Sequence, residues 1–209
     1  AAEGRHHAEA VRADDAHLAT PRVRQDIQSS LNFAASNEII ASFDRPNLLI
    51  EVQPKVNPLP QTLQFLERFK DQSGIIYCFS RKQVDELTEF LFARGFSVRP
   101  YHAGLPDSER QSNQDAFSRD YVQIIVATIA FGMGIDKPDV RFVIHHDMPK
   151  SLEGYYQETG RAGRDGLPSE CLLLFSAGDV VKQTAFIEEK ANPHEQQMAR
   201  TQLQQMVHY

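Results

Sequence analysis

The sequence predicts an α/β fold in which a mainly parallel sheet lies between two layers of helices, followed by a helical C-terminal tail. Two observations lead to this prediction. Short apolar runs of strand length alternate along the chain with stretches of helical periodicity. The runs are also almost continuously apolar, as in strands that are buried on both faces. Because crossovers between parallel strands are right-handed, this alternation predicts one open sheet with helices on each side.

The apolar runs and the helical periods define the expected elements in order. We expect strands at 48–52, 75–79, 97–101, 123–128, 141–145 and 171–175. We expect helices at 58–70, 81–94, 106–119 and 151–163, the first of them opened by Pro58 and Pro60. The Gln-rich stretch 179–209 reads as a helical tail that is interrupted at Pro193.

Composition limits the class of protein. The chain has 209 residues and a net charge of −6, so any contact with nucleic acid should be local or shared with another domain. No apolar run is long enough to span a bilayer, and the start lacks the layout of a signal peptide. Both cysteines, Cys78 and Cys171, lie inside apolar runs. We therefore expect buried thiols, no metal site and an intracellular, reducing location.

Three segments follow expected strands and should lie at the carboxyl edge of the sheet, where open parallel sheets bind ligands. They are 80–82, 102–104 and 130–136. Ser80 and Gln83 have the spacing of a capping box, which would leave helix amides facing outward. Glycines in the other two segments allow a backbone to approach a ligand closely. The alternative is that these glycines only turn the chain.

A sharper pattern lies in residues 157–166, QETGRAGRDG. If 151–163 is helical, Gln157, Arg161 and Arg164 are spaced i, i+4 and i+7 and share a face. Arginine suits phosphate because its planar guanidinium donates two hydrogen bonds and stays charged. The alternative is a pair of solvated arginines that bond to Glu158 or Asp165.

These strings resemble the ordered motifs of superfamily 2 helicases, in their RecQ form. Residues 155–166 (YYQETGRAGRDG) look like motif VI, and residues 126–138 (VATIAFGMGIDKP) look like motif V. Residues 75–80 (IIYCFS) resemble motif IV, and residues 101–105 (YHAGL) resemble the motif after it. Residues 42–48 (SFDRPNL) resemble the family's entry into its second motor lobe.

The resemblance runs from about residue 42 to residue 175 and implies a RecA-like lobe. By this analogy Arg164 is the arginine finger that reaches the γ-phosphate of ATP on the other lobe. Arg161 would be a second phosphate contact, and Gln157 would couple closure of the site to the reaction. Asp136, with Gly134 beside it, would approach the nucleotide.

The resemblance also implies a track for single-stranded DNA, contacted mainly through its phosphates. Its expected lining residues are Ser80, Arg81, His102, Gly104 and Thr128. The family uses ATP and Mg²⁺ to unwind DNA 3′ to 5′, and the implied partners are single-stranded and forked DNA and an N-terminal RecA-like lobe. The implied processes are DNA repair, recombination and replication.

Some family features are missing from this sequence. It contains no G-x-x-x-x-G-K-[ST] string and no D-E-x-H or D-E-A-D string, so we expect the first lobe to hold most of the ATP and Mg²⁺ contacts. The cysteine-rich zinc module of relatives is absent as well. We therefore expect a piece of a longer helicase, inactive by itself. Its expected parts are a flanking segment at 1–41, the lobe at 42–178 and the helical tail at 179–209.

Two other functions fit part of the pattern. An RNA helicase of the DEAD-box type shares the Gly-Arg-x-Gly-Arg core, but typically carries His where Gln157 stands. A scaffold lobe without catalysis is the second alternative, and the two intact arginines of motif VI argue against it. Whether DNA or RNA stimulates ATP hydrolysis more strongly distinguishes a DNA helicase from an RNA helicase. ATP turnover in the presence of the other lobe tests the scaffold alternative.

Overall fold

The computed structural model describes residues 29–30, 45–128, 131 and 136–208. The chain divides into two units, Ala1–Arg45 and Pro46–Tyr209, and the elements named here belong to the second. Its strands are β1 (Leu48–Pro54), β2 (Gly74–Tyr77), β3 (Val98–Tyr101), β4 (Ile124–Ala127), β5 (Phe142–His145) and β6 (Ser169–Phe175). Each lies within or overlaps the apolar run that predicted it.

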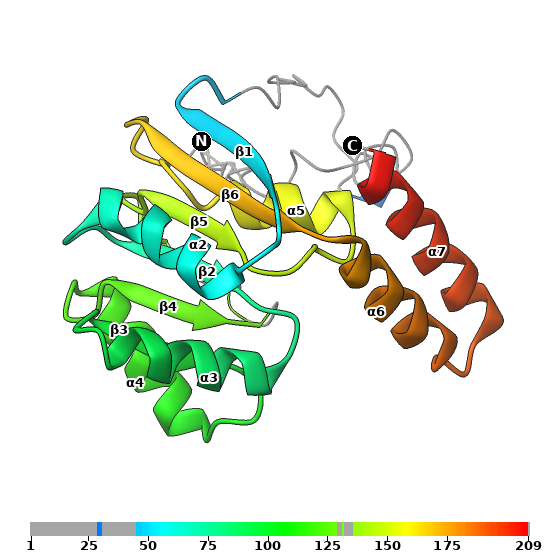
Figure 1. Cartoon of the computed structure of the whole chain (residues 1–209), viewed down its shortest axis with the longest axis horizontal. Coiled ribbons are helices and arrows are strands. Elements are labelled where there is room, and N and C mark those ends of the chain that lie inside the picture. Colours follow the sequence, from blue (N-terminus) through cyan, green and yellow to red (C-terminus); the bar gives the residue numbers. More distant parts are fainter. Residues whose placement is uncertain (1–28, 31–44, 129–130, 132–135, 209) are drawn as a thin grey trace, which may run out of the picture. The chain divides into compact units, whose positions relative to one another are not determined.

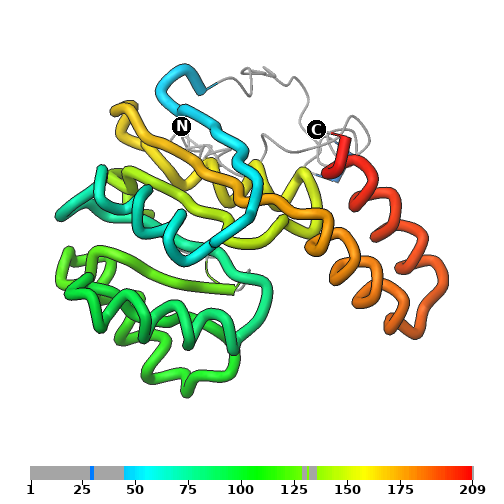
Figure 2. The backbone as a smooth tube through the Cα atoms, viewed as in Figure 1, coloured from blue at the N-terminus to red at the C-terminus, as the bar shows by residue number. Residues whose placement is uncertain are grey.

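The strands form one sheet in the order β1-β6-β5-β2-β4-β3, and all neighbouring strands are parallel (Figure 1). Strands β2, β4 and β5 are buried throughout, which explains their continuous apolar sequences. The first strand, β1, lies beside the last, β6, with Leu48 opposite Ser169 (Figure 2). The parallel sheet predicted from the sequence is therefore confirmed.

Helices cover both faces of the sheet. Helices α2 (Pro58–Leu66), continued by the 3₁₀ turn η2 (Glu67–Phe69), and α3 (Arg81–Phe92) pack on one face. Helix α4 (Asp107–Ser118) and the turn that follows α5 (Leu152–Thr159) pack on the other. This is the three-layer RecA-like arrangement. Cys78 lies in the first apolar layer and Cys171 in the second, and both thiols are buried, as expected.

The C-terminal part forms a helical hairpin of α6 (Ala177–Glu188) and α7 (Pro193–His208) beside the sheet (Figure 1). Ile187, Leu203 and Met206 pack with Tyr155 and Leu173, so the hairpin shares an apolar cluster with the lobe. The predicted break at Pro193 is confirmed, since α7 begins there. Within the described residues, no helix has the length and apolar character needed to cross a bilayer.

One predicted helix is too long. We expected 151–163, but α5 ends at Thr159. The chain then tightens, because the amides of Arg161 and Ala162 donate to carbonyls three residues back. Gly163 takes a left-handed φ of +59°, and its amide donates to the Val140 carbonyl at 2.8 Å. A helix cannot continue through this conformation, so Gln157, Arg161 and Arg164 do not share a helical face.

Candidate functional site

The turn between β2 and α3 presents a helix N-terminus at the carboxyl edge of the sheet. The Gln83 amide donates to Ser80 Oγ at 3.3 Å, and the Ser80 amide donates to Gln83 Oε1 at 3.1 Å. The capping box predicted from the sequence is therefore confirmed. Arg81 is exposed in the first turn of α3, so a cationic side chain stands beside this helix end.

The turn after β3 is held by a buried histidine. The Gly104 amide donates to His102 Nδ1 at 3.1 Å, so His102 Nε2 carries the proton that is shared with Asp85 Oδ1 at 2.9 Å. A Cβ on Gly104 would lie 3.0 Å from the His102 ring and 3.2 Å from Arg81 Cδ. The fold thus brings Arg81, His102 and Gly104 together, and it buries the imidazole while leaving Gly104 exposed.

Thr128 lies at the end of β4, between the other two turns. Its amide donates to the Tyr101 carbonyl at 3.2 Å, which extends the β3–β4 pairing by one bond. Since β2, β4 and β3 are neighbours in the sheet, the segments after them form one continuous edge. All five residues expected to contact DNA lie in these segments (Ser80, Arg81, His102, Gly104 and Thr128).

Arg164 and Asp136 meet at a different place. Arg164 Nη1 lies 3.5 Å from Asp136 Oδ1, and the two side chains are 36% and 92% exposed. The next residue, Asp165, donates its amide to the Pro138 carbonyl, just before β5. We expected segment 130–136 at the carboxyl edge, and its residue Phe131 lies there, since its amide donates to the Thr128 carbonyl at 3.1 Å. Asp136, the other described residue of the segment, contacts Arg164 instead. Gly134 lies outside the described residues.

Arg161 approaches the buried hydroxyl of Tyr77, at the end of β2. The hydroxyl donates to the Phe131 carbonyl at 3.1 Å. Burial raises the pKa of Tyr77, while the charge and hydrogen bonding of Arg161 act in the opposite direction. Arg161 Nε is buried and has no hydrogen-bond partner among the described residues. Gln157, the other expected residue of motif VI, is exposed on α5.

The two carboxylates that could have neutralised these arginines have other partners. Glu158 is buried, and its Oε2 lies 2.7 Å from His145 Nε2. The His145 ring in turn stacks on Tyr77. Asp165 pairs with Arg141, whose hydrogen bond lowers the pKa of the Asp165 carboxyl. Glu158 and Asp165 are therefore engaged by His145 and Arg141, which argues against the alternative in which they pair with Arg161 and Arg164.

Sequence reasoning missed a buried carboxylate at the end of β5. Asp147 accepts hydrogen bonds from Lys55 Nζ (2.5 Å), the Phe79 amide (3.1 Å) and Gln83 Nε2 (2.9 Å). Burial by itself would raise the pKa of Asp147, but the nearby His146 ring, the hydrogen bond from Lys55 and the Lys55 charge hold it well below its usual range. The available signal was an acidic residue directly after an apolar strand.

A protein-family model described as the helicase conserved C-terminal domain matches residues 54–166. The chain belongs to this family. It is 48% identical over 181 residues to the ATP-dependent DNA helicase RecQ of Pasteurella multocida. It is 47% identical over 198 residues to the RecQ-like DNA helicase BLM of Xenopus laevis. These likenesses, which cover 87% and 91% of the chain, identify it as a RecQ-type C-terminal lobe.

A third relative carries a different name. The chain is 42% identical over 192 residues to a putative ATP-dependent RNA helicase of Acanthamoeba polyphaga mimivirus, covering 91% of the chain. The chain spans 29%, 14% and 35% of the lengths of these three relatives. Most of each relative therefore lies outside the matched region.

One group in the helicase lobe has the composition of a metal site. The ligand atoms of Cys78, His146 and Asp147 lie within 4.8 Å of one another. Burial, and then the charge of Asp147, raises the pKa of the Cys78 thiol, so it stays protonated at neutral pH. Asp147 already binds the Lys55 ammonium. Because metals bind thiolates rather than thiols, this group is poorly suited to hold an ion.

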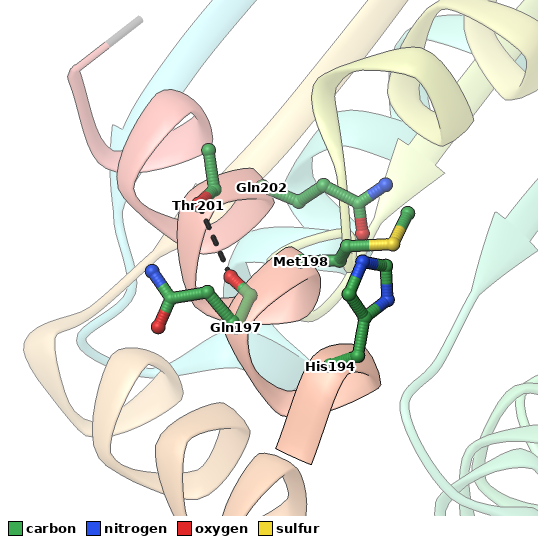
Figure 3. Close-up of a pocket in the computed structure, with 5 residues that line it drawn as sticks. All are labelled: His194, Gln197, Met198, Thr201 and Gln202. Carbon is green, nitrogen blue, oxygen red and sulfur yellow. Dashed lines mark hydrogen bonds between the residues drawn. The ribbon is translucent and has the colours of Figure 1, made fainter. Parts of the chain in front are cut away.

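A hollow of about 270 Å³ lies on the helical tail (Figure 3). All of its lining residues belong to α7 (His194, Gln197, Met198, Thr201 and Gln202). The Thr201 hydroxyl is turned back to the Gln197 carbonyl at 3.1 Å, so it is engaged within the helix. The hollow contains neither a charged cluster nor a segment of the carboxyl edge.

Proposed function

We propose that the chain is the second motor lobe of an ATP-dependent DNA helicase of RecQ type. In this proposal it supplies an arginine finger and part of a track for single-stranded DNA, and the complete enzyme unwinds DNA 3′ to 5′. The first RecA-like lobe supplies the phosphate-binding loop and most Mg²⁺ contacts. The observation that carries the proposal is the pair of motif VI arginines, which the fold leaves without the carboxylates next to them in sequence.

The residues fit a nucleotide held between two lobes. Among the described residues, Arg164 has a long, exposed contact to Asp136, and a guanidinium held this lightly can take up phosphate oxygens. Arg161 is more enclosed, since its Nε is buried and its hydrogen bonding and charge act on Tyr77. Asp136, whose side chain is 92% exposed, would accept a hydrogen bond from a sugar hydroxyl. Bound ATP supplies the phosphoryl group that is transferred to water. Gln157 would couple closure of the site between the lobes to this reaction.

Arg164 acts on the charge that develops during the reaction. As the bond to the γ-phosphate loosens, negative charge spreads over the transferring oxygens. A guanidinium placed there stabilises the transition state more than the bound substrate, so it raises turnover rather than affinity. Asp136 holds Arg164 at the lobe surface until the lobes close.

The carboxyl-edge segments would bind the sugar-phosphate backbone. The α3 N-terminus and Arg81 offer donors to successive phosphates, and the exposed Gly104, which has no side chain, lets a strand approach closely. His102 contributes by position, since both of its ring nitrogens hold the turn. Thr128 completes the row from β4. Such contacts carry no base information, so binding is blind to sequence.

In the proposed domain organisation, residues 42–178 form the motor lobe, 179–209 form a helical tail and 1–41 form a flanking segment. The processes served are repair, recombination and replication. An enzyme that acts on DNA in these processes works in the cytoplasm and nucleoid, or in the nucleus.

The test is Arg164→Ala in the complete two-lobe enzyme. We expect turnover to fall about 10³- to 10⁵-fold, or roughly 4–7 kcal/mol of transition-state stabilisation, with ATP affinity largely retained. Arg164→Lys should fail nearly as badly, because an ammonium lacks the planar pair of donors. Arg68→Ala is the matched control, because Arg68 is an exposed, ion-paired arginine on η2.

The measurements are steady-state turnover and nucleotide affinity on the same preparations. Turnover of the Arg164 variants within a few-fold of wild type would show that Arg164 is not the finger, and would favour a scaffold lobe. The name of the viral relative keeps an RNA helicase as a second candidate. Stronger stimulation of wild-type turnover by single-stranded RNA than by DNA of equal length would establish it.

A further inference from the structure

Two helix N-termini at the carboxyl edge carry the same capping arrangement. At α3, Gln83 is the third helical residue and bonds back to Ser80. At α6, Asp179 is the third helical residue and accepts hydrogen bonds from the Ser176 amide and hydroxyl, both at 3.0 Å. In each case the side chain that closes the capping box also has a partner outside its own helix.

Those outside partners join the two helices through a buried ion network. Gln83 donates to Asp147, and Lys55 Nζ lies between Asp147 (2.5 Å) and Asp179 (3.2 Å). The side chains of Lys55, Asp147 and Asp179 are only 10%, 4% and 3% exposed. The network therefore runs without a break from the capping side chain of α3 to that of α6.

Asp147 also holds the backbone of the turn before α3. Its Oδ2 accepts a hydrogen bond from the backbone amide of Phe79, which is the residue before Ser80. The Phe79 ring also meets the Phe186 ring of α6 edge-on, with centroids 5.9 Å apart. The turn that carries Ser80 and Arg81 is thus connected to α6 by a polar path and by an aromatic contact.

We infer that Asp147 is a positioning residue that sets the geometry of the 79–81 turn and couples this turn to the α6–α7 hairpin through Lys55 and Asp179. The inference rests on the proposed function, in which the turn binds DNA. A displacement of α6 that moved Asp179 would move Lys55, then Asp147, then the Phe79 amide. A ligand or domain acting on the hairpin would change DNA affinity by this path.

Physical reasons favour positioning over simple stabilisation. A buried ion network stabilises a fold little better than apolar side chains of similar volume, because desolvation offsets the attraction. Charge-assisted hydrogen bonds, however, are short and directional, so they fix the atoms that make them. Asp147 applies them to an amide of the turn itself. A change at Asp147 should therefore appear in DNA binding and not only in stability.

The lobe contains a matched control at the opposite edge of the sheet. There the buried Lys137 lies between Asp120 (2.5 Å) and Asp139 (3.0 Å), before the starts of β4 and β5. Asp120→Asn removes one carboxylate from a buried lysine, as Asp179→Asn does. Asparagine also tolerates the left-handed φ of +63° at position 120.

The experiment measures ATP turnover of the complete two-lobe enzyme against the concentration of single-stranded oligothymidylate. For Asp147→Asn we expect the half-maximal DNA concentration to rise about tenfold, or about 1.4 kcal/mol. Turnover at saturating DNA should stay within about twofold of wild type, as for a loss of binding alone. Asp179→Asn, at the far end of the network, should raise the half-maximal concentration about threefold.

Hydrogen exchange gives a second readout. Exchange of the Phe79 amide should be faster in both variants and unchanged in Asp120→Asn. If Asp147→Asn does not fold, Asp179→Asn decides, because it leaves the bonds from Phe79 and Gln83 to Asp147 in place. Thermal stability lowered in all three variants, with DNA half-points equal to wild type, would show that the network is only structural. Wild-type turnover that no DNA stimulates would instead overturn the proposed function, and this inference with it.

Discussion

Gly163 illustrates how one residue of motif VI serves structure and chemistry together. Its φ of +59° ends the helical course of the chain between the two arginines. Its carbonyl accepts a hydrogen bond from Asn47 Nδ2 at 2.9 Å, and its amide donates to the Val140 carbonyl. The glycine thereby directs Arg161 toward Tyr77 and Arg164 toward Asp136.

We predict that Gly163→Ala destabilises the lobe by about 3 kcal/mol, from backbone strain of about 1 kcal/mol and overpacking of about 2 kcal/mol. The added Cβ would lie 2.5 Å from Asn47 Nδ2 and 2.9 Å from the Leu167 carbonyl. Gly166→Ala is the control, because its φ is +81° with nothing within 4 Å of the added Cβ. Urea unfolding measures the free energy of unfolding of both variants. Equal losses of stability in the two would argue that close packing at Gly163 is unimportant.

At the scale of elements, short helices are positioned by their ends. Helices α3 and α6 each begin with a capping box, and the residues that close the two boxes meet in the network around Lys55. Local sequence predicts the order of strands and helices, and contacts between helix ends then fix the orientations of these helices. A buried carboxylate at such a junction makes the junction sensitive to acid.

We predict that Asp147→Asn removes part of the acid sensitivity of folding. In the unfolded chain an aspartate takes up its proton near pH 3.9, whereas the folded-state pKa of Asp147 is lower. The unfolded state therefore binds more protons below about pH 4, and the stability that Asp147 contributes is lost as pH falls. Near pH 7 the variant should be about 3 kcal/mol less stable than wild type.

The measurement is the free energy of unfolding by urea from pH 7 to pH 3. The difference between wild type and Asp147→Asn should shrink steadily below about pH 4, where the wild-type carboxylate loses its advantage. A difference that stays constant across this range would contradict the lowered pKa of Asp147.

At the scale of the molecule, we expect ATP hydrolysis to need groups from the other lobe. The sequence has no G-x-x-x-x-G-K-[ST] string, the loop that cradles phosphates in such motors. We predict that the 209-residue chain alone hydrolyses ATP at background rate, with or without single-stranded DNA. A phosphate-release assay checks this, with the complete enzyme as positive control. DNA-stimulated turnover by the isolated chain would refute it.

DNA binding by the isolated chain should be weak. The net charge of −6 opposes polyanions, and the carboxyl edge offers few cationic side chains. We predict a Kd of about 10–100 µM, typical of nonspecific binding, that weakens as salt rises. Arg81→Ala should weaken it further, whereas Arg68→Ala should not. Fluorescence anisotropy with oligonucleotides of different sequence measures this, and tight binding indifferent to salt would be inconsistent with phosphate contacts.

The sequence by itself determined the succession of strands and helices along the chain, the burial of β2, β4 and β5 and of both cysteines, the capping box at Ser80 and the family of the lobe. These features follow from periodicity, capping and motifs, which are read over a few consecutive residues. Such short windows suffice because the central strands β2, β4 and β5 are apolar along almost their whole length and each helix repeats within a turn.

Only the tertiary structure decided where α5 ends and which charges pair. The left-handed turn at Gly163, after the end of α5, is held by Asn47, which lies 116 residues from Gly163 in the chain. The partners of Arg164 and Glu158 are likewise distant, at Asp136 and His145. The network at Asp147 joins segments after β1, β2, β5 and β6. A local pattern cannot specify such partners, because they meet only once the sheet has brought the ends of its strands together.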